Sequence, residues 1–284
     1  LDKNYIDVTE DSIAKVATEY YKKHGPRRNY ARALYYLGKS YYYNEEYDKA
    51  ILEFSKAEKV AEGCDSLYLG MIYSGKADTY NKTYNANEEL NCIQKALKIF
   101  KDIGSEQYIR PLTFSLGNAY HNSNRYKEAK DIYETIIKST TETDYYTIQS
   151  HLRLAHSSLE LPDADHFYIE SLFRKAKEVY GADLQEKDYW AWAYSLYRVG
   201  KEVDADKIVQ NITISDELTA NFWKTRIYVY LKDYKAAYDS DLLTIDYQNN
   251  IVKNVLEESL ASYQRDYYQS ELESSEYKVK TRTM

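Results

Sequence analysis

Histidine and cysteine side chains are the residues of this sequence that could carry catalysis or bind a metal. His121, His151 and His156 lie within one stretch of the chain, and Cys64 and Cys92 are the 2 cysteines among 284 residues. No CxxC pair, HExxH helix, GxSxG elbow or glycine-rich phosphate loop accompanies them. Acid–base or metal chemistry at a histidine needs partner carboxylates, and no such motif is present. We therefore predict no catalytic residue, no metal site and no cofactor, and expect a protein that is not an enzyme.

The composition favours a folded, all-helical protein that does not bind nucleic acid. The chain is 44% hydrophobic and 29% charged, which is enough apolar surface for a core. Its 9 glycines and 3 prolines are too few for the turns of a β-sandwich or a doubly wound sheet. A formal charge of −7 argues against binding to phosphate backbones, which depends on clustered Lys and Arg. No apolar run reaches the roughly 18 to 20 residues of a membrane span.

A repeated pattern of small and large residues organises the chain. The spacing L-G-x2-Y followed by A-x3-F begins at Leu37 and returns at Leu116, where Tyr takes the place of Phe. Weaker copies contain Tyr80, Leu154, Trp192 and Tyr228. In the second copy, Glu89 stands where the pattern has a small Ala, and the fourth copy carries an insertion around Pro162. The starts of the first five copies are Ala31, Gly70, Arg110, Ile148 and Glu186.

This pattern resembles that of tetratricopeptide repeat proteins over roughly residues 30 to 245. The resemblance implies an all-α fold, a right-handed superhelix of about six stacked antiparallel helix pairs. We expect residues 1–29 to form an N-terminal capping helix, a partial repeat with Ile13, Val16 and Tyr20 on one apolar face. Residues 30–246 would form the repeat array, and residues 247–284 one long C-terminal helix.

In such a superhelix, the first helix of each repeat lines a concave groove. Tyr, Trp and Arg dominate binding energy at interfaces, and the chain has 34 Tyr against 6 Phe. The family's groove positions also include Asp78, Asn81 and Lys82 in the second repeat. We predict that ligand binds to these groove residues: Tyr35, Tyr36, Lys39, Tyr42, Tyr43, Asn118, Arg153, Trp190, Tyr194, Arg198, Trp223 and Arg226.

One subclass of the family grips a C-terminal carboxylate with Lys, Asn and Arg from three successive helices. Here the corresponding set is incomplete, because only Asn118, Gln149 and Arg153 approach it. We therefore disfavour that role, while a looser contact of Asn118 and Arg153 with an acidic peptide stays open as a hypothesis.

The segments that begin at Tyr21 and Tyr47, and the polar end of the chain, resemble the extracytoplasmic repeat domains of bacterial sensor or regulator proteins. That resemblance implies a periplasmic or extracytoplasmic location and a membrane span after the last helix, although a cytoplasmic location stays open. Our leading hypothesis is a non-enzymatic scaffold for a protein or peptide, acting as a sensory or regulatory ectodomain through its groove. The alternative is a periplasmic carbohydrate-binding or assembly-associated protein whose groove aromatics stack on sugar rings. The sequence carries no signal for an oligomeric state.

Overall fold

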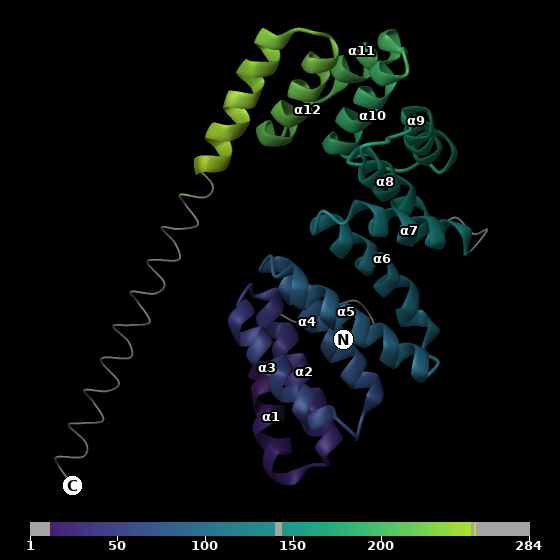
Figure 1. Cartoon of the computed structure of the whole chain (residues 1–284). Coiled ribbons are helices and arrows are strands. Elements are labelled where there is room, and N and C mark those ends of the chain that lie inside the picture. The colour runs from purple at the N-terminus through teal and green to yellow at the C-terminus, as the bar shows by residue number, and fades with distance from the viewer. Residues whose placement is uncertain (1–11, 140–143, 251–252, 254–284) are drawn as a thin grey trace, which may run out of the picture. The chain divides into compact units, whose positions relative to one another are not determined.

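The computed structural model describes residues 12–139, 144–250 and 253, and within these ranges the chain forms helices joined by short turns (Figure 1). The chain divides into two compact units, Leu1–Asp183 and Leu184–Met284. Each unit consists of consecutive helices that pack in pairs. The predicted all-α fold of about six stacked helix pairs is therefore confirmed for the described residues.

Unit 1 contains a leading helix, α1 (Ser12–His24), and four helix pairs. The first helices of the pairs are α2 (Arg27–Tyr43), α4 (Ser66–Lys82), α6 (Glu106–Asn122) and α8 (Tyr145–Leu159). The second helices are α3 (Tyr47–Ala61), α5 (Ala86–Asp102), α7 (Tyr126–Lys138) and α9 (His166–Arg174), the last of which continues into a π-helical turn, Lys175–Val179. Each first helix also contacts the second helix of the preceding pair, so the pairs form one continuous stack within the unit.

Small residues at the signature positions let large rings enter the contacts between helices. The buried ring of Phe54 lies between α2 and α4, where a Cβ on Gly38 or on Gly75 would come within 2.7 Å of it. In the third pair, a Cβ on Gly117 would lie 2.6 Å from the ring of Tyr133. Any larger residue at these glycines would displace a ring from a close-packed core. The repeated L-G spacing of the sequence is thus a packing requirement.

The turn inside a repeat is made in the same way in both units. A residue with positive φ ends the first helix, at Glu45, Tyr84 and Asn124 in unit 1 and at Gly200 and Lys232 in unit 2. The left-handed conformation reverses the chain in very few residues, so the second helix lies directly against the first. The fourth repeat differs, since the insertion around Pro162 replaces this turn with a longer connection, 160–165.

Helix α1 packs against α2, but not through the apolar face expected from the sequence. Ala14 and Thr18 are its buried residues, whereas Ile13, Val16 and Tyr20 are exposed. These three residues of the predicted apolar face are therefore not buried against α2, and the capping role of residues 1–29 stays a prediction. The small side chains of Ala14 and Thr18 allow a close approach to α2, which the larger residues would prevent.

Unit 2 contains α10 (Glu186–Arg198), α11 (Glu202–Asn211) and α12 (Glu217–Tyr230), followed by a helix over residues 234–250. Helix α10 packs against both α11 and α12. The helix 234–250 extends past the domain boundary predicted at residue 246. The rest of the long C-terminal helix predicted for residues 247–284 lies outside the described residues, apart from residue 253. None of the described helices is long and apolar enough to cross a lipid bilayer.

Candidate functional site

A polar pocket of about 130 Å³ lies in unit 1 among the helices of its first three repeats. It is bounded by α2, α4 and α6, which are first helices, and by the second helix α5. Helical spacing explains how each helix supplies more than one group, because residues three or four apart share a face. Asp78 and Asn81 are such a pair on α4, as are Ser115 and Asn118 on α6. The full lining is Tyr42, Ala77, Asp78, Asn81, Glu89, Ile93, Leu112, Ser115 and Asn118.

Glu89 is the least expected member of this pocket. It occupies the α5 position where the repeat pattern has a small Ala, and it is only 5% exposed. One carboxylate oxygen accepts a hydrogen bond of 2.9 Å from the side-chain amide of Asn81. Burial raises the pKa of Glu89; the Asn81 hydrogen bond opposes that rise, and the negative charge of Asp78 adds to it. The fold thus retains a carboxylate in a position where packing alone would favour a methyl group.

Asp78 lies beside it with no hydrogen bond or ion pair to any described residue. Its surface stays open to solvent, but the pocket walls displace much of the surrounding water, and this desolvation raises its pKa. The positive charges of Lys39 and Lys82 act in the opposite direction. Two carboxyl groups with raised pKa values therefore face one small cavity. Raised pKa values of this kind are typical of functional sites.

Hydroxyl and amide groups complete the lining. Burial raises the pKa of Tyr42 to about 12, and the charge of Asp78 adds to the effect, so its hydroxyl stays a hydrogen-bond donor at neutral pH. The side-chain hydroxyl groups of Tyr42 and Ser115 line the pocket and have no hydrogen bond to a described residue. The Asn118 oxygen accepts a hydrogen bond of 2.8 Å from the hydroxyl of Tyr133, which leaves its NH2 group for the pocket. The site therefore offers both donors and acceptors.

Two of the residues predicted from the sequence, Tyr42 and Asn118, line this pocket, and a third lies next to it. The ammonium of Lys39 is 5.3 Å from the ring centre of Tyr42 and 4.7 Å from that of Tyr43. Arg153 on α8 is not part of the lining, although its charge acts on the buried Tyr133. The hypothesis that Asn118 and Arg153 together hold an acidic peptide stays a prediction.

The predicted tyrosine cluster on α2 is mostly engaged with other rings. Tyr35 is buried, and its ring makes edge contacts with Tyr36 and Tyr68, with centroids 5.2 and 5.5 Å apart. The hydroxyl groups of Tyr36 and Tyr68 lie 3.0 Å apart. Tyr35 was expected in the groove and lies in the core instead, because its ring fills the space beside Phe54. Only Tyr36, Tyr42 and Tyr43 keep part of their surface in solvent.

In unit 2 the predicted tryptophans are likewise packing residues. Trp190 and Trp223 are buried, which corrects the expectation that their faces are open to a ligand. The indole N–H of Trp190 donates to Glu186 at 3.2 Å. Three predicted residues stay at the surface: Arg198 donates to the hydroxyl of Tyr194 at 2.8 Å, and Arg226 lies over the rings of Phe222 and Trp223. We see them as a small basic and aromatic surface of unit 2.

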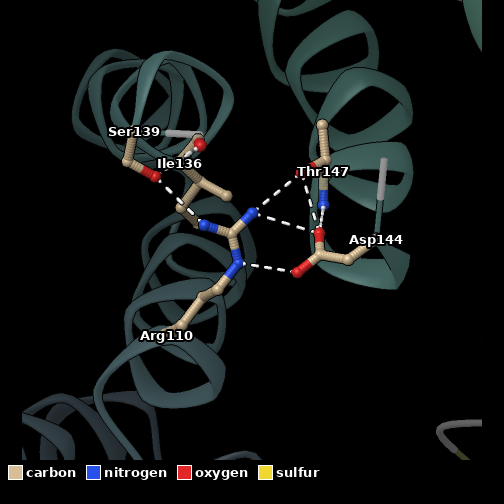
Figure 2. A network of polar contacts seen from close by, with 5 residues as sticks. All are labelled: Arg110, Ile136, Ser139, Asp144 and Thr147. Atoms are coloured by element: carbon tan, nitrogen blue, oxygen red, sulfur yellow. Dashed lines mark hydrogen bonds and ion pairs between the residues drawn. The ribbon is translucent and has the colours of Figure 1, made fainter. Parts of the chain in front are cut away.

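A polar network centred on Arg110 sets the spacing of α6 and α8 (Figure 2). Its guanidinium binds both carboxylate oxygens of Asp144, at 2.9 and 3.1 Å, and donates to Thr147 at 2.8 Å and to Ser139 at 3.0 Å. Asp144 also caps α8 by accepting from the Thr147 backbone N–H at 2.8 Å. Burial raises the pKa of Asp144, but the hydrogen bonds from Arg110 and Thr147 outweigh this and hold it below its ordinary value.

The same kind of bond recurs between the first two repeats. Arg32 on α2 donates to Asp65 at 2.9 Å, and Asp65 caps α4 through the backbone N–H of Tyr68. An arginine on one first helix thus holds the N-terminal cap of the next first helix. Such bonds hold neighbouring first helices of unit 1, and the groove residues on them, in fixed positions relative to one another.

Sequence reasoning did not select Glu89 or Ser115 as site residues. The signal for Glu89 was present, because a charged residue replaced a small one in an otherwise recognisable repeat. Asp78 and Asn81 fall on groove positions of the repeat, but the predicted set does not include them. A charged residue at a small packing position is thus a stronger indication of this pocket than the aromatic residues of the first helices.

No family model matches the chain. Tetratricopeptide repeat protein 29 from Macaca fascicularis is 27% identical over 128 residues. That match covers 44% of this chain, which spans only 27% of the relative's length.

Similar solved structures cover most of the chain. The apo form of RapI has a TM-score of 0.62 at 12% identity, over 89% of this chain and 95% of that one. A tetratricopeptide repeat protein from Parabacteroides merdae has a TM-score of 0.57 at 13% identity, over 86% and 90%. A Rap protein complexed with Competence and Sporulation Factor has a TM-score of 0.51 at 15% identity, over 87% and 79%. At these identities the likeness establishes the fold alone: the chain is built from stacked helix pairs of the tetratricopeptide repeat type.

Proposed function

We propose that unit 1 binds a peptide, or an extended segment of a protein, across α2, α4 and α6 without catalysing a reaction on it. One observation carries this proposal: three successive first helices present the side chains of Tyr42, Asp78 and Ser115 to one pocket, and none of these side chains has a hydrogen bond to a described residue. Each of these three residues keeps part of its surface open, so its polar group can exchange a hydrogen bond to water for one to a ligand. A ligand that crosses the three helices would satisfy them together.

The size of the pocket favours a peptide over a free small molecule. Its volume of about 130 Å³ is well below the roughly 300 to 1,000 Å³ of typical small-molecule sites. It can enclose a single side chain, so most of any ligand must lie outside it along the helices. A Rap protein of similar fold was solved in complex with Competence and Sporulation Factor, which supports a binding role for such a scaffold.

The ring packing gives less support to a carbohydrate ligand. Stacking on a sugar needs an exposed ring face, and Trp190 and Trp223 are buried. On α2, the rings of Tyr42 and Tyr43 pack edge to face, with their centroids 5.4 Å apart. We retain the extracytoplasmic, membrane-tethered setting as part of the proposal; it rests on the sequence resemblance, and fractionation of cells that produce the full-length protein would test it.

Peptide binding can be tested by blocking the pocket. A displayed library of random decapeptides would be selected on the purified chain, and synthetic copies of the enriched peptides titrated by calorimetry against Ser115→Trp. Since Ser115 lines the pocket, the indole would occupy it, and we expect at least tenfold weaker binding. Asn87→Trp is the matched control, because Asn87 is exposed at the start of α5 and outside the lining. Circular dichroism would verify that both variants fold.

Two outcomes would contradict the proposal. One is the absence of any enriched peptide, and the other is equal affinity of the selected peptides for the wild type and for Ser115→Trp. Loss of binding in Asn87→Trp as well would show that the peptides contact the surface elsewhere.

A further inference from the structure

The carboxyl groups of Asp78 and Glu89 line the same pocket, and no lysine or arginine among the described residues forms an ion pair with either. Burial raises the pKa of Glu89, and the negative charge of Asp78 on the neighbouring helix adds to the rise. The nearest cations are Lys39, which lies over the rings of Tyr42 and Tyr43, and Lys82, which is exposed one turn along α4 from Asp78. Neither lysine forms an ion pair within 4.0 Å with a described residue. The site therefore has an unsatisfied preference for positive charge.

The rest of the lining is apolar on one side. Ala77, Ile93 and Leu112 are buried residues of the pocket wall and belong to the hydrophobic core of the second and third repeats. A cation without a hydrocarbon stem would leave this wall in contact with water. A long amphipathic side chain would place methylene groups against the wall and its charge at the carboxylates.

We propose that the pocket is the binding site for a lysine side chain of the peptide, with the ammonium between Asp78 and Glu89 and the methylene stem against Ile93 and Leu112. This inference rests on the proposed peptide-binding function and names the residue that the peptide must carry. The lysine ammonium has three N–H donors. The pocket offers three acceptor groups to match them: the carboxylates of Asp78 and Glu89 and the side-chain oxygen of Asn81. Tyr42 and Asn118 remain as donors to the peptide backbone.

Other cations fit the pocket less well. A guanidinium is planar and binds best where a carboxylate presents both oxygens side by side, whereas one oxygen of Glu89 is already bonded to Asn81. A peptide amino terminus lacks the methylene stem that the apolar wall favours. A metal ion is not supported by the donors present, since the described residues contain no group of three His, Cys, Asp or Glu side chains that could hold one.

The test uses small probes with the chemistry of single side chains. n-Butylammonium chloride, n-butylguanidinium chloride, glycine N-methylamide and n-butanol would each be titrated into the isotope-labelled full chain. The side-chain amide resonances of Asn81 and Asn118 are the readout, because both amides line the pocket. We expect saturable shifts with n-butylammonium, affinity at least tenfold lower for the guanidinium and for the amino-terminal analogue, and no saturable shift with n-butanol.

Isosteric variants locate the effect at the carboxylates. Glu89→Gln and Asp78→Asn should each weaken n-butylammonium binding at least tenfold while keeping the shape of the pocket. Asp102→Asn is the charge-matched control, because Asp102 is exposed at the end of α5 and outside the lining. Its affinity for n-butylammonium should equal that of the wild type.

Any of three results would overturn the lysine inference. The first is that n-butanol gives shifts equal to those of n-butylammonium, and the second is that n-butylguanidinium or glycine N-methylamide binds more tightly than n-butylammonium. The third is that Glu89→Gln binds n-butylammonium as tightly as the wild type does. These results are distinct from failure of the peptide-binding function. If Ser115→Trp abolishes binding of selected peptides while n-butylammonium gives no shift, the function holds and the lysine assignment is wrong. If no peptide is selected but n-butylammonium binds, the pocket recognises an ammonium group and the peptide proposal is wrong.

Discussion

The pKa values of two carboxyl groups in unit 1, those of Asp144 and Glu89, are shifted in opposite directions. Asp144 receives hydrogen bonds from Arg110 and Thr147, and its pKa is lowered. Glu89 has one hydrogen bond, from Asn81, and a second carboxyl as neighbour, and its pKa is raised. Both lie at helix–helix contacts of the same stack, so the fold alone does not explain the difference. What differs is whether the protein supplies the partner for the charge.

This difference separates structural polar groups from binding groups. A site whose charge is paired with an opposite charge of the protein, which we call complete, stabilises the arrangement of neighbouring repeats; the Arg110–Asp144 pair is such a site. A buried charge without such partners lowers the stability of the fold, and proteins retain such groups where function needs them. Mutations at the two sites should therefore change stability in opposite directions, and only those at Glu89 and Asp78 should change ligand binding.

The largest expected effect is a loss of stability at the complete network. Arg110→Ala removes bonds to Ser139, Asp144 and Thr147 and leaves the Asp144 charge partly buried. We expect a loss of about 2 kcal/mol in the free energy of unfolding, measured by urea denaturation. For a chain of this size that corresponds to a melting temperature lower by roughly 4 to 8 °C. Binding of n-butylammonium should be unchanged.

Arg28→Ala is the control for this prediction. Arg28 is exposed on α2 and has no hydrogen bond or ion pair to a described residue, so its removal should cost less than about 0.5 kcal/mol. An equal loss for Arg110→Ala and Arg28→Ala would show that the network contributes nothing to stability.

At the incomplete site we expect a smaller effect of opposite sign. Glu89→Gln keeps the side-chain shape and an oxygen for Asn81, and it removes a charge that the buried position disfavours. The free energy of unfolding at pH 7 should rise by about 1 kcal/mol. Glu88→Gln, the same change at the exposed neighbouring position, should leave stability unchanged. A clear loss of stability in Glu89→Gln would mean that Glu89 serves the fold.

The pH dependence of the two mutational effects should also differ. Because the folded pKa of Glu89 is raised, its destabilising effect is present above the folded pKa and disappears as pH falls toward the unfolded value of about 4.3. The gain in the free energy of unfolding that Glu89→Gln produces should therefore shrink as pH falls from 7 to about 4. Because the folded pKa of Asp144 is lowered, its stabilising bonds persist above the unfolded value of about 3.9.

The loss in the free energy of unfolding caused by Arg110→Ala should accordingly stay constant between pH 7 and about 4. It should shrink only below about pH 4. Urea titrations of both variants and the wild type across the range would check this. Parallel pH profiles for the two variants would contradict the assignment of opposite pKa shifts.

The sequence predicted those features that depend on one residue and its near neighbours in the chain. The L-G-x2-Y spacing identified the helix pairs, because Gly38 must be small wherever Phe54 packs. The groove positions implied by the family resemblance also include Asn118, which lines the pocket. Features that depend on a third helix were not predictable in this way.

Tyr35 illustrates that limit: its burial depends on Tyr68, which belongs to the next repeat. The Arg110 network likewise joins three helices, and only the structure brings Ser139 and Asp144 to the same guanidinium. Glu89 is an intermediate case. The sequence showed that it broke the repeat pattern, but its significance depends on the pocket that Asp78 and Asn118 form with it.

The smallest expected change in stability, and the sharpest separation of the two kinds of site, is at Asp78. Asp78→Asn alters a side chain that is open to solvent and has no hydrogen bond to a described residue. Stability should therefore stay within about 0.5 kcal/mol of the wild type. The same variant should lose n-butylammonium binding, because the amide removes one of the two charges that hold the ammonium. Urea denaturation and the Asn81 resonance shifts would measure both quantities on one sample. A variant that loses stability and keeps the ligand would place Asp78 with Asp144 as a structural group, and the distinction between complete and incomplete charge sites would fail at this position.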